Sequence, residues 1–281
     1  MNTTHSASPI GIFDSGVGGL SVLKAIQQIL PGEEIIFLAD QAHVPYGPRS
    51  LEEVRRFSFA ITEYLLNQGA KLIVVACNTA SAAALHELRR RYPQTPFVGM
   101  EPAVKPAAEQ TQTGVVGVLA TPATFQGALY ASVIERFANG VTVLQDTCPG
   151  LVAQIEAGKL NEHETRRILK AALDPMLDQG IDTIVLGCTH YPFVIPLIQD
   201  ITGPKVRVID PAPAVARQIV RRLEASDQFN PDPIRKPPRY LTTGDPVQLQ
   251  KLLSEILRIH SAVMPLYWDD IKLAMQLSSK A

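Results

Sequence analysis

The sequence predicts an α/β fold made of two pseudosymmetric lobes, each with a mainly parallel sheet. First, short β-branched apolar runs alternate with helical patterns, which is typical of parallel βαβ units. Second, residues 71–77 and 181–188 are both apolar runs that end in a cysteine followed by small hydroxyl residues. We expect a first lobe of residues 1–101 plus 211–281, a second lobe of residues 102–210, and the site in the cleft between them.

In the first lobe, an apolar strand at residues 10–14 runs into the glycine-rich turn 15–19 and then a helix. The glycines predict close approach of backbone N–H groups to an anionic ligand, although Gly16-x-Gly18-Gly19 lacks the spacing of a dinucleotide-binding turn. The elements expected next are a strand at 34–39, a helix capped by Ser50 and Glu53 that stops near Gly69, the strand 71–77, an alanine-rich helix to about Arg91, and a strand at 97–100.

In the second lobe, strands are expected at 114–120, 141–145, 181–188 and 205–209. Thr121-Pro122 is a threonine cap followed by proline at the first helical position, and Asn161 with Glu164 predicts a capping box for the long helix before the Cys188 strand. The remainder of the chain predicts a helix after Pro211, a polar proline-rich stretch at 226–238, a strand at 240–243 and a last amphipathic helix from Asp245.

Composition is that of a globular protein. A chain of 281 residues suggests about two domains, and 46% hydrophobic with 19% charged residues allows a sizeable core. A net charge of −1 without a basic run predicts no nucleic-acid partner. Three cysteines without a Cys-x-x-Cys pair favour reduced thiols and a cytoplasmic location. The polar residues 1–9 do not resemble a signal peptide, and no apolar run is long enough for a membrane span, so no membrane association is expected.

The two strand-end cysteines carry the candidate chemistry. A lone buried cysteine is most often structural, and Cys148, which precedes a proline in a loop, is interpreted in that way. Cys77 and Cys188 share a repeated context, at strand ends where a helix N-terminus would favour the thiolate. Opposed acid and base groups, one on each face of a carbon, are what inversion by proton transfer requires. Asp14 and His190 lie in the same set of strand-end loops and could tune protonation.

Other site chemistries have weaker support. Cys77, Cys188 and His190 have zinc-compatible atoms, but no closely spaced pair of ligands supports a metal site, so none is expected. A cysteine hydrolase would leave the second cysteine unexplained. No lysine falls within these motifs, which argues against a pyridoxal-phosphate Schiff base.

Four motifs, in order, resemble those of the glutamate racemases: residues 11–19 (GIFDSGVGG), 44–47 (VPYG), 76–80 (ACNTA) and 187–192 (GCTHYP). The similarity extends from about Ile10 to the last helix. It implies an enzyme without cofactors that interconverts L- and D-glutamate by two-base proton transfer at Cα and supplies D-glutamate for peptidoglycan synthesis. It also implies two α/β lobes that enclose the substrate, and a homodimer.

Carried over by motif, Cys77 and Cys188 would be the acid/base thiols, with Asp14 assisting Cys77 and His190 assisting Cys188. Glu156 matches a family glutamate near the site. The substrate-binding residues that the resemblance implies are Asp14, Ser15, Pro45, Tyr46, Gly47, Asn78, Thr79, Thr121, Thr124, Thr189 and His190. Two positions depart from the family pattern, since His43 stands where an arginine is usual and Gln126-Gly127 replaces a common Lys-Ser.

Two other functions fit the same residues. One is a racemase of the same superfamily that acts on aspartate or another acid. The other is a two-lobed amino-acid-binding protein without catalysis, which would have no need of two strand-end cysteines. Loss of optical rotation from pure L-glutamate separates an enzyme from a binding protein.

Overall fold

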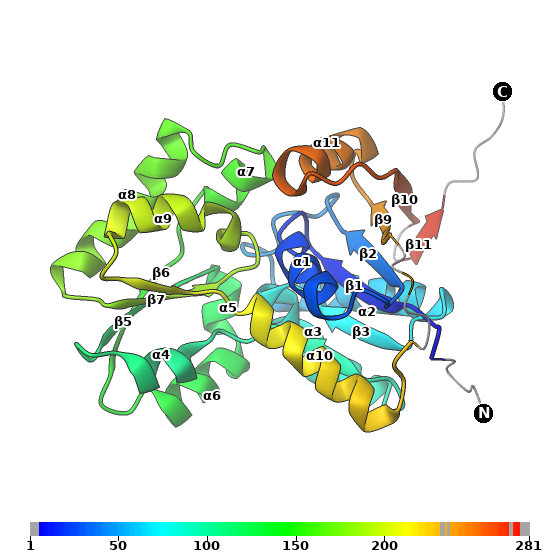
Figure 1. Cartoon of the computed structure of the whole chain (residues 1–281), viewed down its shortest axis with the longest axis horizontal. Helices are drawn as coiled ribbons and strands as arrows, with labels where there is room; N and C mark the ends of the chain where they lie inside the picture. The colour runs from blue at the N-terminus through cyan, green and yellow to red at the C-terminus, as the bar shows by residue number, and fades with distance from the viewer. Residues whose placement is uncertain (1–5, 231–233, 235–236, 270–271, 276–281) are drawn as a thin grey trace.

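The computed structural model describes residues 6–230, 234, 237–269 and 272–275, whose strands form two sheets (Figure 1). The first sheet contains β1 (Ile10–Asp14), β2 (Ile35–Ala39), β3 (Leu72–Val75), β4 (Phe97–Gly99), β9 (Arg239–Thr242), β10 (Val263–Asp269) and β11 (Lys272–Met275). The second sheet contains β5 (Val115–Ala120), β6 (Thr142–Asp146), β7 (Thr183–Gly187) and β8 (Arg207–Ile209). The predicted α/β class with mainly parallel sheets is confirmed.

The two sheets repeat one strand order. The first sheet contains the consecutive neighbours β2, β1, β3 and β4, and the second sheet runs β6, β5, β7 and β8. Every pairing within these two sets is parallel. β3 and β7 therefore occupy equivalent places in the two sheets, and they are the strands that lead to Cys77 and Cys188.

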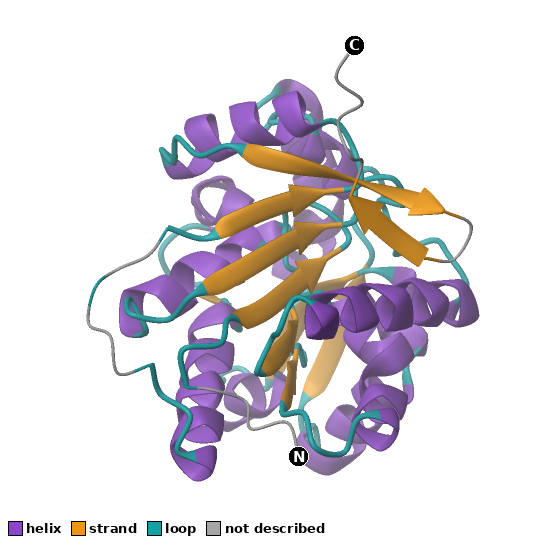
Figure 2. Cartoon of the chain, turned by 90° about the vertical axis from the view of Figure 1, so that its right-hand side faces the viewer, coloured by secondary structure: helices purple, strands orange, loops and turns teal. Residues whose placement is uncertain are grey.

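β1 is buried along its whole length, and its side chains alternate between two apolar layers. Ile10 and Ile12 pack in the cluster that includes α1 (Leu20–Ile29) and α10 (Ala212–Ser226), whereas Phe13 packs with α2 (Leu51–Asn67) and α3 (Asn78–Arg91). Helices cover both faces of the first sheet, as Figure 2 shows. The carboxyl ends of its strands are consequently the place where a ligand site can form.

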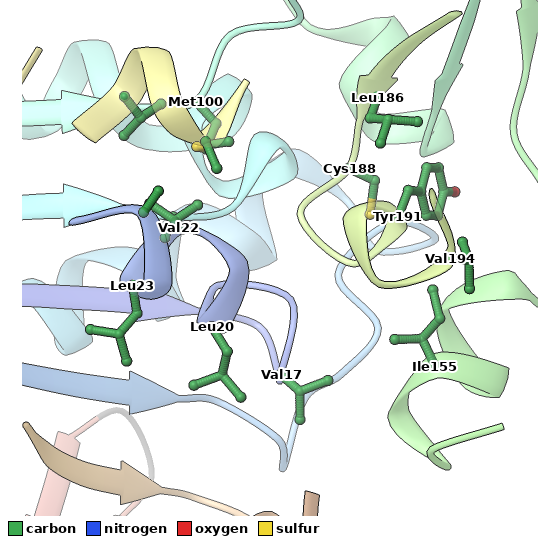
Figure 3. Packing of buried hydrophobic residues seen from close by; sticks show 14 of the residues in the cluster. Val17, Leu20, Val22, Leu23, Met100, Ile155, Leu186, Cys188, Tyr191 and Val194 are labelled. Carbon is green, nitrogen blue, oxygen red and sulfur yellow. The ribbon is translucent and has the colours of Figure 1, made fainter. Parts of the chain in front are cut away.

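The second sheet is also covered on both faces. One layer contains α4 (Val104–Gln110) and α6 (Ala128–Phe137), and the other contains α8 (His163–Asp178) and α9 (Ile195–Thr202). Short helices follow the strand ends: α5 (Pro122–Gln126), α7 (Leu151–Glu156) and the 3₁₀ helix η1 (Tyr191–Val194). One apolar cluster joins both sheets, and Figure 3 shows Val17 and Leu20 in it together with Ile155 and Tyr191.

Two predicted capping boxes have different outcomes. The box of Ser50 and Glu53 is confirmed, because each side chain bonds the other residue's backbone N–H at the start of α2. The box predicted for Asn161 and Glu164 is wrong, since α8 begins at His163 with Glu162 at its N-cap and no side-chain cap. The Glu164 carboxylate instead pairs with Arg167 at 2.7 Å, one turn further along the helix.

The end of the chain differs from the prediction. β9 and the helix α11 (Pro246–Leu257) are present as expected, with the Asp245 side chain capping α11. The strands β10 and β11 were not predicted; β10 pairs with β9 in parallel and β11 pairs with β10 in antiparallel fashion. Of the proline-rich stretch 226–238, residues 231–233 and 235–236 lie outside the described residues. Throughout the described ranges, every helix is too short or too polar to cross a membrane.

Candidate active site

A small cavity, with room for about 10 Å³ or roughly one water molecule, lies where β1, β3, β5 and β7 end, between the two sheets. Its lining consists of Ser15, Pro45, Tyr46, Gly47, Cys77, Asn78, Thr79, Thr121, Val152, Cys188, Thr189 and His190. Both strand-end cysteines line it. The structure therefore brings together most of the residues singled out in the sequence, with Asp14, Thr124 and Glu156 behind this lining.

Cys77 is the N-cap of α3, and its Sγ accepts a hydrogen bond from the backbone N–H of Ala80 at 3.4 Å. Burial raises the pKa of the Cys77 thiol well above its ordinary value, and the nearby charge of Asp14 adds to the rise. The expectation that the helix N-terminus would favour the thiolate is wrong here, because desolvation outweighs the backbone hydrogen bond. Cys77 is therefore a protonated thiol at neutral pH.

Cys188 follows β7 and does not cap a helix, since η1 begins only at Tyr191. The predicted helix N-terminus at Cys188 is thus displaced by three residues, and an imidazole takes its place beside the sulfur. His190 Nδ1 lies 3.8 Å from Cys188 Sγ, and His190 Nε2 lies 2.5 Å from Glu156 Oε1. Burial alone would lower the pKa of His190, but Cys188 and Glu156 outweigh it and raise that pKa well above the ordinary value.

The glycine-rich turn after β1 binds two carboxylates of the chain itself. Asp14 Oδ2 accepts the N–H groups of Gly16 and Gly19 at 3.2 and 2.9 Å, and Glu156 Oε1 accepts the N–H of Val17 at 2.7 Å. The predicted approach of this turn to an anion is correct in kind, but these N–H groups meet protein carboxylates and not a ligand. A Cβ on Gly16 would lie 1.9 Å from Glu156 Oε1, so the close contact requires glycine.

Asp14 is fully buried directly behind this turn. Burial raises its pKa above the ordinary value, although the His190 charge and the backbone N–H groups oppose the rise. Thr189 Oγ1 donates to Asp14 Oδ1 at 3.3 Å. Asp14 therefore connects the β1 turn with the loop that carries Cys188, in addition to influencing Cys77.

Asn78 is the clearest candidate for a ligand-binding side chain. It lines the cavity and is 3% exposed, and among the described residues neither its Oδ1 nor its Nδ2 has a hydrogen-bond partner. Buried amides without partners are costly. The Asn78 amide is therefore available to a polar group that enters the cavity.

The hydroxyl groups of the remaining predicted binding residues have two kinds of hydrogen-bond partner. Three hydroxyls bond one another across the sheets, with Thr79 Oγ1 at 2.8 Å from Thr121 Oγ1 and Thr121 Oγ1 at 3.0 Å from Thr124 Oγ1. The hydroxyl of Tyr46, which also lines the cavity, donates to Asp40 at 2.6 Å. The Val44–Pro45 peptide bond in this loop is cis.

Three residues near the site were not predicted. Gln41 Nε2 donates to Glu156 Oε2 at 3.1 Å, Ser21 Oγ donates to the Thr189 carbonyl at 3.0 Å, and Val152 lines the cavity. The position of Gln41 just after a strand is a signal that could have identified it. Its hydrogen-bond partner Glu156, however, is 115 residues away in the sequence. Within the described part of the chain, no group of three or more His, Cys, Asp or Glu side chains could hold a metal ion.

Comparison with known proteins gives a consistent result. The family described as Asp/Glu/Hydantoin racemase matches residues 10–219. The chain is 51% identical to a glutamate racemase of Roseiflexus sp. (strain RS-1), covering 90% of this chain and 93% of that protein. The crystal structure of glutamate racemase isoform RacE1 from Bacillus anthracis is 33% identical with a TM-score of 0.85, covering 95% of this chain and 100% of that one. Escherichia coli glutamate racemase, crystallised with L-glutamate and the activator UDP-MurNAc-ala, is 32% identical with a TM-score of 0.81, covering 95% and 99%.

Proposed function

The chain belongs to the Asp/Glu/Hydantoin racemase family and is an isomerase, and from this premise we propose that it interconverts L- and D-glutamate by proton transfer between two cysteines. The observation that carries the proposal is that Cys77 and Cys188, which follow equivalent strands of the two sheets, line one small cavity. Relatives whose sequences are about 50% identical to this chain are glutamate racemases, and this supports glutamate as the substrate.

In the proposed reaction, one cysteine thiolate removes the Cα proton and becomes a thiol. The electron pair left on Cα is delocalised into the adjacent carboxylate. The other cysteine donates its thiol proton to the opposite face of Cα and becomes a thiolate. The configuration is inverted, no electrons are gained or lost, and no cofactor is consumed.

The two thiols have different surroundings. Cys77 is protonated at neutral pH because burial raises its pKa, so it begins as the proton donor. His190, whose pKa is raised by its contacts with Cys188 and Glu156, places a charged imidazole beside the other cysteine. Glu156 fixes this imidazole, and Asp14 acts on the Cys77 side.

The charged groups of the substrate are met mainly by neutral donors. The cavity lining contains hydroxyls and one amide but no lysine or arginine. We assign the unpartnered Asn78 amide to a substrate carboxylate, with Ser15, Thr79 and Thr189 as further hydrogen-bonding groups. Charge-assisted hydrogen bonds of this kind are about twice as strong as neutral ones.

The biological setting follows from the resemblance to glutamate racemases. We infer that the enzyme works in the cytoplasm as a homodimer and supplies D-glutamate for peptidoglycan synthesis. We also infer that residues 1–101 plus 211–281 form one lobe and residues 102–210 the other, because the two sheets divide the chain in this way.

The test is to follow the optical rotation of pure L-glutamate with the purified protein and no added cofactor. Rotation should decay to zero, and the Cys77→Ser variant should leave it almost unchanged. L-Aspartate in parallel should decay far more slowly. Faster decay with L-aspartate would assign the enzyme to that substrate, and stable rotation with tight glutamate binding would indicate a binding protein.

A further inference from the structure

A fully buried carboxylate near the cavity is not used by the proposed chemistry. Asp40 follows β2, has no exposed area and accepts hydrogen bonds from four side chains. Its donors are the Tyr46 hydroxyl at 2.6 Å, Thr243 Oγ1 at 2.7 Å, Trp268 Nε1 at 2.8 Å and His43 Nδ1 at 2.9 Å. A carboxylate offers about four lone-pair sites, so these donors account for its full capacity.

The four donors come from segments that are distant in sequence. His43 and Tyr46 lie in the loop after β2, Thr243 follows β9, and Trp268 lies in β10. The Phe57 ring stacks on His43 with centroids 3.9 Å apart, and Trp268 makes a T-shaped contact with the same imidazole. Asp40 therefore ties the β2 loop to two further strands of the first sheet.

Tyr46 connects this cluster to the cavity. It lines the cavity, it is 1% exposed, and its hydroxyl points to Asp40. Burial and the Asp40 charge raise the pKa of Tyr46 well above its ordinary value, so the phenol keeps its proton and continues to donate. The hydroxyl is therefore engaged by Asp40 in a residue that also lines the cavity.

The same loop also supports the second sheet. The Gly47 carbonyl accepts the N–H of Ala123 at 3.3 Å, and a Cβ on Gly47 would lie 2.8 Å from the Thr121 Cβ. Thr121 in turn bonds Thr79 at 2.8 Å inside the site. A shift of Tyr46 would consequently move Gly47 and disturb the threonines beside the catalytic Cys77.

We propose that Asp40 is a positioning residue for racemisation, which acts by holding Tyr46 and does not touch the substrate. This inference rests on the proposed function and assigns to it a residue outside the cavity lining. Loss of the Asp40–Tyr46 hydrogen bond should weaken the use of glutamate beyond what any loss of stability explains.

The main test compares Asp40→Asn, Tyr46→Phe and the double variant in steady-state kinetics with glutamate. Each single variant should lower kcat/KM by about tenfold or more, mainly through KM, because the wall of the binding site is loosened. The double variant should be no worse than Tyr46→Phe alone, since the effect of Asp40→Asn on the site passes through the bond that Tyr46→Phe already removes. Additive losses would overturn the proposal.

A control variant separates positioning from stability. Glu33→Gln weakens the buried pair with Lys71, whose Nζ lies 2.6 Å from Glu33 Oε2 at the opposite ends of the strands. It should lower the thermal unfolding temperature and keep KM within about twofold of wild type. A similar KM change in this control at equal loss of stability would also overturn the proposal.

Failure of the proposed function can be told apart from failure of this inference. A wild-type protein that does not racemise glutamate contradicts the function, and crystal structures of wild type and Asp40→Asn then decide the inference. Displacement of residues 44–47 in the variant supports the positioning role. An unchanged loop, with Tyr46 in the same orientation, overturns it.

Discussion

His190 and Glu156 form a buried pair in which Nε2 lies 2.5 Å from Oε1. The same carboxylate accepts the N–H of Val17 at 2.7 Å and the amide of Gln41 at 3.1 Å, both from the segments that follow strands of the first sheet. Glu156 thus performs two tasks at once. It orients the imidazole beside Cys188, and it joins the second sheet to the glycine-rich turn of the first.

The Glu156→Gln variant should lose stability in a pH-dependent way. Burial raises the pKa of Glu156, but its bonds with His190 outweigh this and hold the pKa below the ordinary 4.5. The contribution of the ionised Glu156 carboxylate to the free energy of unfolding is therefore complete above about pH 4.5 and is lost as pH falls through the lowered value. The pKa of His190 is raised above 6.5, so its contribution is complete below about pH 6.5 and lost as pH rises through the raised value. Urea unfolding should show the largest deficit of the variant between these limits. A stability deficit that does not change with pH would contradict a charged pair between Glu156 and His190.

Gly16→Ala should disturb catalysis without straining the backbone. Its Cβ would lie 1.9 Å from Glu156 Oε1, so the carboxylate must move and release Val17 or His190. We expect kcat/KM to fall by about a hundredfold, as misplacement of site groups by about 1 Å can do. Gly140→Ala is the matched control, because Gly140 has a φ of +77° and open space around it; it should cost about 1 kcal/mol of stability and leave the kinetics unchanged. Equal kinetics of both variants would contradict this role of the turn.

The sequence was most informative where local patterns determine the structure. The β1 strand, the Ser50 cap and the cysteines at the ends of β3 and β7 follow from apolar runs and capping residues. The hydrogen bond from the glycine-rich turn to Glu156 could not be predicted from local pattern, because Glu156 lies 139 residues from Val17. The role of Asp40 was hidden for the same reason, since Thr243 and Trp268 are 203 and 228 residues away. Long-range hydrogen bonds of this kind leave no periodic signal in a single sequence.

Burial also explains the incorrect expectation about Cys77. The sequence places a cysteine at a helix N-terminus, where a thiolate is favoured. The structure surrounds that sulfur with the apolar cluster of the first sheet and adds the negative charge of Asp14. Local helix electrostatics can be predicted from sequence, whereas the desolvation that outweighs them depends on the assembled fold.

Asn78→Ala should separate binding from stability. Removing an unpartnered buried amide should leave the unfolding temperature unchanged or higher, while the use of glutamate weakens by ~1–3 kcal/mol in kcat/KM. Ser81→Ala, in the same helix, is the matched control. Its hydroxyl donates to the Val75 carbonyl at 3.1 Å and accepts from Met100 N at 2.9 Å, so this variant should lose stability and retain its kinetics. Unchanged kinetics of Asn78→Ala would show that the carboxylate binds elsewhere.

The serine variants test the two thiols individually. Cys77→Ser and Cys188→Ser should each reduce racemisation by several orders of magnitude, because a hydroxyl is a far weaker acid than a thiol. Cys148→Ser is the matched control, since Cys148 is also buried, at 2% exposure, but lies outside the cavity lining. It should racemise glutamate at nearly the wild-type rate. Near-normal turnover by either of the first two variants would contradict the two-thiol mechanism.

Solvent isotope incorporation gives the most direct test of two thiols on opposite faces of Cα. If one cysteine removes the proton and the other returns one, the returned proton comes from a thiol that has exchanged with solvent. Starting from L-glutamate in heavy water, early D-glutamate should therefore carry deuterium at Cα while unreacted L-glutamate keeps protium, as mass spectrometry of the separated enantiomers would show. Starting from D-glutamate, the labels should be reversed. A single base serving both faces would return part of the original proton, so substantial protium in the early product would contradict the assignment of Cys77 and Cys188 to separate faces.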